Sequence, residues 1–278
     1  MTRLSFLCVL VAIFSNLGLE HVSSQDLFPD KNLEAVVRRE VFEKQNSKDP
    51  LVAKDVENIS QIKGIGKSIK SLKGLEACIS LRSIWLDQNE IVDVSPLQKL
   101  DLLQQVMLKE NKIVDVTPLK DLKKLQHLDL SNNQIESIAA LSEFSNMRSF
   151  YVAHNKIKDL GVVTNYTKAW SIYAQGNPIN DLKPVSGLRF LDHLDVSKTL
   201  VMDLSALSPL TNLKRVMLED SKVTDLTTLV EMAKKDAAGE MRFSPFWNIH
   251  LKGCKLSEKA KTAQIQELKK LGSRIHTE

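Results

Sequence analysis

Hydrophobic residues recur along most of the chain at one fixed set of spacings. In "LQHLDLSNNQI", which starts at Leu125, leucines fill the first, fourth and sixth positions, an asparagine the ninth and an isoleucine the eleventh. A weaker copy starts at Ile59, and a last copy at Phe246 follows an 11-residue insertion at 233–243. A fixed period of this length indicates a solenoid of stacked repeats. The regular copies start every 22 residues, at Leu81, Leu103, Leu125, Met147, Ala169, Leu191 and Leu213.

Each repeat is predicted to contain one short strand and one return segment. Alternate residues of the LxL core are apolar, as in a strand with one buried face. The asparagine follows the strand, where its amide can satisfy buried backbone groups along the stack. Ser95-Pro96 and Thr117-Pro118 read as an N-cap followed by proline, which predicts a short helix or 3₁₀ turn on the outer side. Asparagine fills its slot at Asn89, Asn111, Asn133, Asn155 and Asn177, and Thr199, Ser221 and Cys254 replace it later.

These features are typical of a leucine-rich repeat solenoid, an α/β fold. Such a fold has a curved parallel sheet on its concave face and short helical or 3₁₀ returns on its convex face. Helices are expected to cap both ends, because a bare solenoid exposes apolar end faces. We expect a helical N-terminal cap at 25–58, repeats at 59–256 and a C-terminal capping helix at 257–278. The apolar faces of the two caps are predicted to contain Leu33, Val36, Val37 and Val41 at one end and Ala263, Ile265, Leu268 and Leu271 at the other.

Residues 1–24 resemble a secretory signal peptide. Arg3 precedes an apolar run from Leu4 to Phe14, which is too short for a membrane span, and small residues lie near Ser24. Cleavage predicts a secreted protein, or one of the periplasm or cell envelope, with no membrane span after removal of the signal. The alternative is an uncleaved N-terminal anchor.

Charge and cysteine content narrow the possible partners and cross-links. The formal net charge is +4, and both signs are interspersed along the chain. Because no basic stripe is concentrated in one segment, we expect no nucleic-acid partner. Cys78 and Cys254 belong to repeats too far apart for a disulfide, so we expect both to be free thiols.

The outward positions of the predicted strands carry all three tryptophans and two of the three tyrosines. Aromatic residues and methionine are enriched in the cores of protein interfaces, so we interpret this face as a recognition surface. The alternative is that these rings only stack on one another, as they do in sheets generally. The candidate ligand-binding residues are Trp85, Met107, Asp129, Tyr151, Trp170, Tyr173, Asp195, Met217, Trp247 and His250.

No motif in the sequence supports catalysis. His127 with Asp129, and His193 with Asp195, are pairs on the concave face that could orient an imidazole or bind a metal. The pairs lie three repeats apart, about 14 Å by strand spacing, which is too far for one metal site. Nucleophile motifs and phosphate-binding loops are missing from the sequence. We expect no enzyme activity, metal or cofactor; the alternative is an enzyme that uses the His/Asp pairs.

The sequence resembles the internalin-type, 22-residue class of bacterial leucine-rich repeat proteins. "FPDKNLEAVV" is similar to the helical cap of that class, and "IVDVSPLQKL" and "IVDVTPLKDL" to its consensus return. The resemblance implies a non-enzymatic binding protein. No immunoglobulin-like domain or wall-sorting motif follows the repeats, so it implies the scaffold and not a role in adhesion. We expect an exported protein that recognises a protein or peptide, less readily a glycan, on its concave face; the alternative is a structural, envelope-associated solenoid without a specific ligand.

Overall fold

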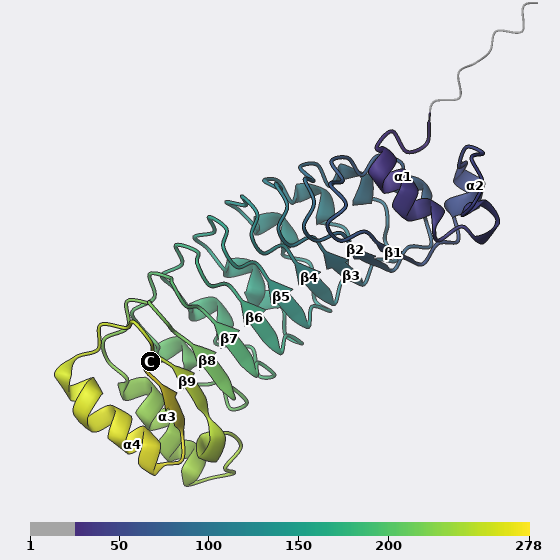
Figure 1. Cartoon of the computed structure of the whole chain (residues 1–278). Helices are drawn as coiled ribbons and strands as arrows, with labels where there is room; N and C mark the ends of the chain where they lie inside the picture. Colours follow the sequence, from purple (N-terminus) through teal and green to yellow (C-terminus); the bar gives the residue numbers. More distant parts are fainter. Residues whose placement is uncertain (1–25) are drawn as a thin grey trace, which may run out of the picture.

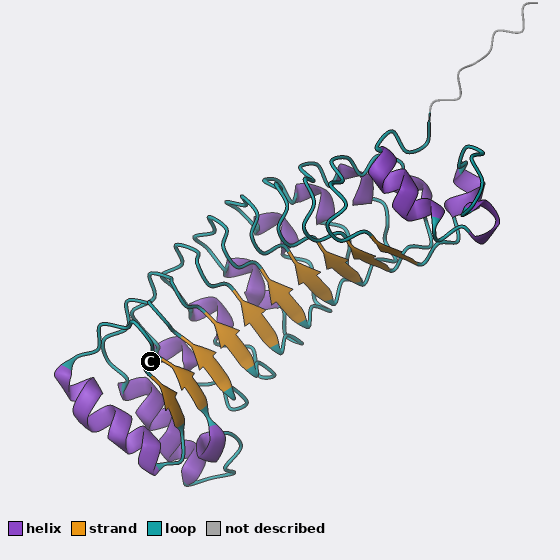
Figure 2. Cartoon of the chain, viewed as in Figure 1, coloured by secondary structure: helices purple, strands orange, loops and turns teal. Residues whose placement is uncertain are grey.

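One parallel sheet runs the length of the molecule. The computed structural model describes residues 26–278, so the predicted signal peptide lies outside the described residues. Ten strands follow one another in sequence order, and the strands line one side of the elongated molecule while short helical turns line the other (Figures 1 and 2). The predicted leucine-rich repeat architecture is therefore confirmed. The strands are β1 (Gln61–Lys63), β2 (Ser83–Trp85), β3 (Gln105–Met107), β4 (His127–Asp129), β5 (Ser149–Tyr151), β6 (Ser171–Tyr173), β7 (His193–Asp195), β8 (Arg215–Met217), β9 (Asn248–His250) and β10 (Arg274–His276).

The return segments are 3₁₀ turns, but their capping differs from the prediction. Ser95 is the first residue of its turn and not its N-cap, and Asp93 accepts its backbone N–H at 2.8 Å. The same arrangement places Asp115 before Thr117. An aspartate two residues upstream therefore caps each turn, whereas the sequence predicted that the serine or threonine would be the cap. The 3₁₀ turns are Phe42–Lys44, Leu75–Ala77, Ser95–Leu97, Thr117–Leu119, Ala139–Leu141, Gly161–Asn165, Lys183–Val185, Ser205–Leu207 and Ser244–Phe246.

The asparagine slot forms a ladder of buried hydrogen bonds between repeats. Nδ2 of Asn133 donates to the carbonyls of Leu108 and Leu130 at 3.0 Å each, and Oδ1 accepts the N–H of Ile113 at 2.9 Å. One amide thus joins two repeats through groups that water cannot reach. The same pattern is present at Asn89, Asn111, Asn155 and Asn177.

Two helices cover the N-terminal end of the stack. They are α1 (Lys31–Arg38) and α2 (Ala53–Val56), and both lie within the predicted N-terminal cap at 25–58. Asp30 caps α1 by accepting the N–H groups of Asn32 and Leu33, and its other oxygen accepts those of Lys70 and Ser71 in the first repeat. Partial burial opposes ionisation, but these four donors hold the pKa of Asp30 below its usual value. One carboxylate therefore fastens the cap to the repeats.

The C-terminal end is closed by helices and by a strand that the sequence reading missed. The elements are α3 (Thr227–Ala237), one π-helical turn (Ala260–Gln264) and α4 (Ile265–Lys270). Ala263 is exposed, contrary to prediction, because the π-helical turn shifts the buried face to Ala260, Gln264 and Leu268. Beyond α4 the chain turns back and β10 pairs in parallel with β9.

Both described cysteines are unpaired, as predicted. Cys78 is buried in the core, and its burial raises the pKa of the thiol to about 12. Cys254 fills the asparagine slot of the last repeat, where its Sγ donates to the Leu218 carbonyl at 3.0 Å. Both thiols therefore act as packing or hydrogen-bonding groups, because a raised pKa disfavours the reactive thiolate.

Candidate functional site

Eight of the predicted ligand-binding residues form one continuous column across the sheet. Each is paired with its neighbour through the register of the parallel strands, so that Trp85 stands beside Met107 and Met107 beside Asp129. The column has Lys63 before it and His276 after it, and neither was predicted as a site residue. The ordered column is Lys63, Trp85, Met107, Asp129, Tyr151, Tyr173, Asp195, Met217, His250 and His276.

The four middle strands repeat their outward residues in mirror order. Strands β4 and β7 both read His-Leu-Asp, and β5 and β6 between them read Ser-Phe-Tyr and Ser-Ile-Tyr. The register therefore aligns His-Ser-Ser-His in one column and Asp-Tyr-Tyr-Asp in the next. We call this surface the central patch; its members are His127, Asp129, Ser149, Tyr151, Ser171, Tyr173, His193 and Asp195.

Two stacked tyrosines occupy the middle of the central patch. The ring centroids of Tyr151 and Tyr173 are 4.6 Å apart, with an interplanar angle of 19°. A hydrogen bond of 2.9 Å joins the Tyr151 hydroxyl to Oγ of Ser171, and the indole N–H of Trp170 donates to Oγ of Ser149 at 2.9 Å. Both serines are themselves buried. The rings are therefore held in place while their outer faces stay half-exposed.

The two aspartates of the central patch are partly buried carboxylates. Oδ1 of Asp129 accepts the N–H of Ser131 at 2.8 Å, and Oδ1 of Asp195 accepts that of Ser197 at 2.9 Å. Burial on the sheet raises the pKa of both carboxyls, an effect that these hydrogen bonds only partly offset. Within residues 26–278, neither aspartate forms an ion pair; the ion pairs of β7 and its neighbours involve Asp192 and Glu219 instead.

The prediction for Trp247 is wrong. Its side chain is fully buried and packs edge to face against Phe243 at 4.7 Å, while Phe246, the first residue of the last repeat, is 64% exposed. The 3₁₀ turn Ser244–Phe246, which follows the insertion, brings Trp247 into the core position in place of Phe246. Trp170, at the matching place in its own repeat, is exposed beside β6 as predicted.

Charged and aromatic groups already pair at both ends of the column. The ammonium of Lys63 lies 4.8 Å from the ring centroid of Trp85. At the other end the imidazoles of His250 and His276 stack at 4.3 Å, and Nδ1 of His250 is 3.4 Å from Glu219. The sequence offered a signal for Lys63, which occupies the outward position of the first, weaker repeat, but none for His276.

Comparisons with known proteins agree with this geometry. A family model described as "Leucine Rich repeats (2 copies)" matches residues 101–143 and 123–165. The crystal structure of internalin C2 from Listeria monocytogenes is similar with 27% identity and a TM-score of 0.57, covering 69% of this chain and 94% of that one. The chain is a leucine-rich repeat protein with an internalin-like fold.

Other comparisons extend the likeness in fold alone. A leucine-rich repeat protein of Leptospira interrogans is 19% identical with a TM-score of 0.57, over 74% of this repeat protein and 57% of that chain. Among proteins with curated descriptions, none matches this sequence. Within residues 26–278 of the repeat protein, no helix has both the length and the apolar character needed to cross a membrane.

The histidines and carboxylates of the repeat protein do not converge on one point. No cluster of three or more potential metal ligands occurs in the part of the chain that the structure describes. His127 and His193 stand on β4 and β7, three strands apart, which is about 14 Å. Burial and the nearby Arg148 lower the pKa of His127, which keeps its imidazole neutral. The arrangement can contact a ligand at several points, and the imidazoles of His193 and His250 each lie 3.4 Å from a carboxylate, of Asp192 and Glu219.

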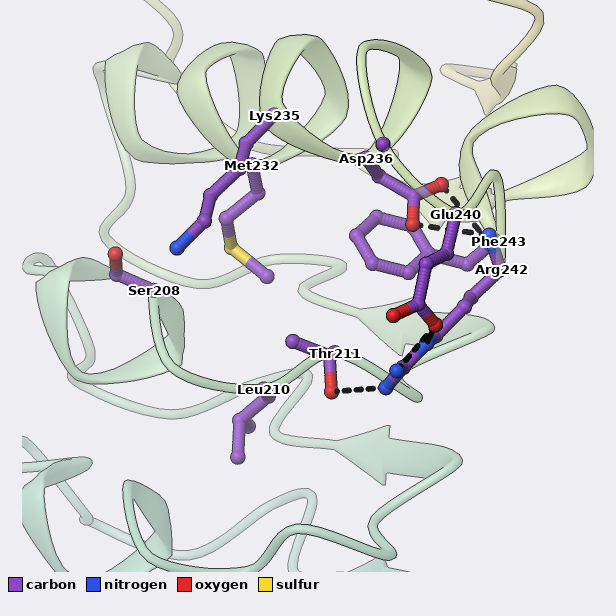
Figure 3. Close-up of a pocket in the computed structure, with 10 residues that line it drawn as sticks. Ser208, Leu210, Thr211, Met232, Lys235, Asp236, Glu240, Arg242 and Phe243 are labelled. Carbon is purple, nitrogen blue, oxygen red and sulfur yellow. Dashed lines mark hydrogen bonds and ion pairs between the residues drawn. The ribbon is translucent and has the colours of Figure 1, made fainter.

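A cavity of about 200 Å³ lies beside the insertion (Figure 3). Its apolar lining includes Leu210, Met232 and Phe243, and Arg242 pairs with the neighbouring Glu240 and donates to Oγ1 of Thr211 at 3.0 Å. Asp236, at the end of α3, accepts the backbone N–H groups of residues 242, 243 and 244. Asp236 thus fixes the turn after α3. The composition of the insertion at 233–243 is typical of an extended outer helix, but α3 runs from Thr227 and ends at Ala237, inside the insertion.

Proposed function

We propose that the protein is an exported, non-enzymatic binding protein that holds a protein or peptide on the strand-lined face, centred on the central patch. Internalin-like repeat proteins are typically binding proteins, and their extended concave surfaces suit macromolecular ligands. The observation that carries the proposal is the Asp-Tyr-Tyr-Asp column, where half-exposed rings and partly buried carboxylates meet on one open surface.

Interface energetics support a protein ligand over a small molecule. Tyrosine and tryptophan contribute large contact areas at low entropic cost and are enriched among the residues that dominate binding. The cavity beside the insertion is remote from this column and lined by other elements. A broad, shallow surface of aromatic and charged groups fits a protein segment lying across the strands.

A pull-down with matched variants tests the proposal. The purified protein is compared with a Trp85→Ala, Tyr151→Ala, Tyr173→Ala variant whose circular dichroism is unchanged, and with Phe42→Ala, which removes an aromatic side chain that is 84% exposed on the N-terminal cap. We expect extracellular and envelope fractions to supply a partner that the wild type and Phe42→Ala retain and the triple variant loses. Equal recovery by all three proteins would favour a structural solenoid without a ligand on this face.

Export is tested separately by the N-terminus of the native protein. We expect mass spectrometry of protein from the producing cell to find a chain that begins near residue 25, because the apolar run and the small residues near Ser24 suit cleavage there. A native chain that starts at Met1 and cofractionates with membranes would support an uncleaved anchor.

A further inference from the structure

Elsewhere in the molecule, some partly buried carboxylates are paired with cations, and others, such as Asp30 and Asp236, accept several backbone N–H groups instead. Glu34 bonds to Arg38 at 2.6 Å, and Asp55 to Lys44 at 2.7 Å. Asp129 and Asp195 have no such partner among the described residues, although burial raises the pKa of both. The charge of Lys109 lowers the pKa of Asp129, but the Lys109 ammonium forms its ion pair with Glu110, at 3.3 Å. The central patch therefore holds two carboxylates that form no ion pair with any cation of residues 26–278.

The stacked tyrosines present one free face to each of these carboxylates. Because the rings of Tyr151 and Tyr173 stack on each other between neighbouring strands, the outer face of Tyr151 is turned toward β4 and that of Tyr173 toward β7. Asp129 stands on β4 and Asp195 on β7, in the same column. Each half of the central patch thus combines an aromatic face with a carboxylate, the pairing that binds a guanidinium or an ammonium group.

The same column contains an internal example of this recognition. Lys63 on β1 lies over the ring of Trp85 on β2, one strand away and 4.8 Å from the ring centroid. The sheet spacing therefore suits a cation seated on an aromatic ring of the neighbouring strand. In the central patch both rings lack such a cation among the described residues, while carboxylates are present beside them.

The mirror order of the strands sets the spacing of the ligand groups. Three strand intervals separate Asp129 from Asp195, about 14 Å. An extended segment rises about 3.3 Å per residue and places alternate side chains on one face, so residues four apart span this distance on the same side. Two basic side chains in such a segment could reach both halves of the central patch at once.

We propose that the partner presents two basic side chains about four residues apart in an extended segment, one between Asp129 and Tyr151 and the other between Asp195 and Tyr173. This inference rests on the proposed function, because it names the chemistry of the partner at the same surface. The inference requires Asp129 and Asp195 for binding, whereas the proposed function could also be met by recognition through the aromatic residues alone.

Peptide display on the intact protein tests the inference. Random dodecapeptides are selected on the wild type, and the affinity of each purified peptide is then measured for three variants. The first variant combines Asp129→Asn with Asp195→Asn, and the second combines Tyr151→Ala with Tyr173→Ala. The third is the control Asp203→Asn, whose carboxylate lies in an exposed turn. We expect enriched peptides to carry arginine or lysine pairs and to lose about tenfold in affinity for each carboxylate removed. Asp203→Asn and the wild type should bind alike, and replacing the basic residues by norleucine should abolish binding.

The other outcomes separate the two proposals. Peptides without basic residues that lose affinity only with the tyrosine variant would overturn the inference and leave the proposed function intact. Basic peptides that weaken equally with Asp203→Asn would show attraction to overall charge and would also overturn it. If no selected peptide depends on either the tyrosines or the aspartates, both the inference and the proposed binding surface fail.

Discussion

At the scale of single residues, the same positions recur but their chemistry changes along the stack. Asn133 bridges two repeats, whereas Thr199 in the same slot donates only to Val196 of its own repeat, at 2.6 Å. The slot was predictable because the spacing is strict and an amide can both donate and accept. The burial of Trp247 was not predictable, because the insertion before it changes how the chain enters strand β9.

Replacement of Asn133 by alanine is predicted to destabilise the protein by about 2–4 kcal/mol, because buried backbone groups of both repeats lose their partners. Urea unfolding followed by circular dichroism measures the change. Asn165→Ala is the control: this exposed amide donates only to the Ser142 carbonyl, and its loss should change stability by less than about 1 kcal/mol. Equal losses in the two variants would mean that the ladder contributes no more than a surface bond.

Replacement of Asp129 by asparagine is predicted to keep or raise stability at neutral pH. Burial raises the pKa of this carboxyl in the folded protein, so the folded state binds its proton more tightly than the unfolded chain. Stability therefore falls as pH rises through the window between the ordinary pKa and the raised one, and the charged form opposes folding above it. Asparagine keeps an acceptor for the Ser131 N–H.

Paired urea titrations at neutral pH and in acid measure this effect. The advantage of Asp129→Asn should shrink in acid, where the carboxyl is protonated in both states. A variant that is clearly less stable than the wild type at neutral pH would show that the carboxylate serves the fold, and would remove a reason to assign it to binding.

At the scale of elements, the strands and turns were predictable and the two ends only in part. Regular repeats carry their pattern in every copy, and the helical faces of the caps follow ordinary periodicity. The strand β10 has only three residues, two of them exposed, so no alternation identifies it; its place depends on pairing with β9. The π-helical turn likewise shifts which residues face the core.

Gly272 controls how the chain passes from α4 to β10. Its φ is +89°, and a Cβ atom there would lie 2.7 Å from Cα of Pro245, which is backbone and cannot move aside. We expect Gly272→Ala to destabilise the C-terminal end by about 1–3 kcal/mol and to speed hydrogen exchange of the amides of β10. Gly187→Ala is the control, since nothing lies within 4 Å of its added Cβ. Unchanged exchange in β10 would contradict the predicted strain.

At the scale of the whole molecule, stacking gives a long surface whose chemistry varies from repeat to repeat while the core does not. The net charge of +4 gives no hint of a local negative region, yet the middle of the strand-lined face holds two carboxylates that form no ion pair within residues 26–278. The mirror order of β4–β7 distinguishes this region from the rest of the column. Binding is therefore expected to concentrate there.

Site-specific photocrosslinking tests this central claim most directly. A photoreactive phenylalanine analogue replaces Met107 or Met217, which stand in the column on either side of the central patch, or Lys123, which is exposed before the start of the Leu125 repeat. We expect positions 107 and 217 to crosslink to the partner recovered by pull-down or to a selected peptide. The yield of both crosslinks should fall when Tyr151→Ala and Tyr173→Ala are introduced together. Position 123 should not crosslink. Crosslinking from Lys123 alone would contradict a binding site on the strand-lined face.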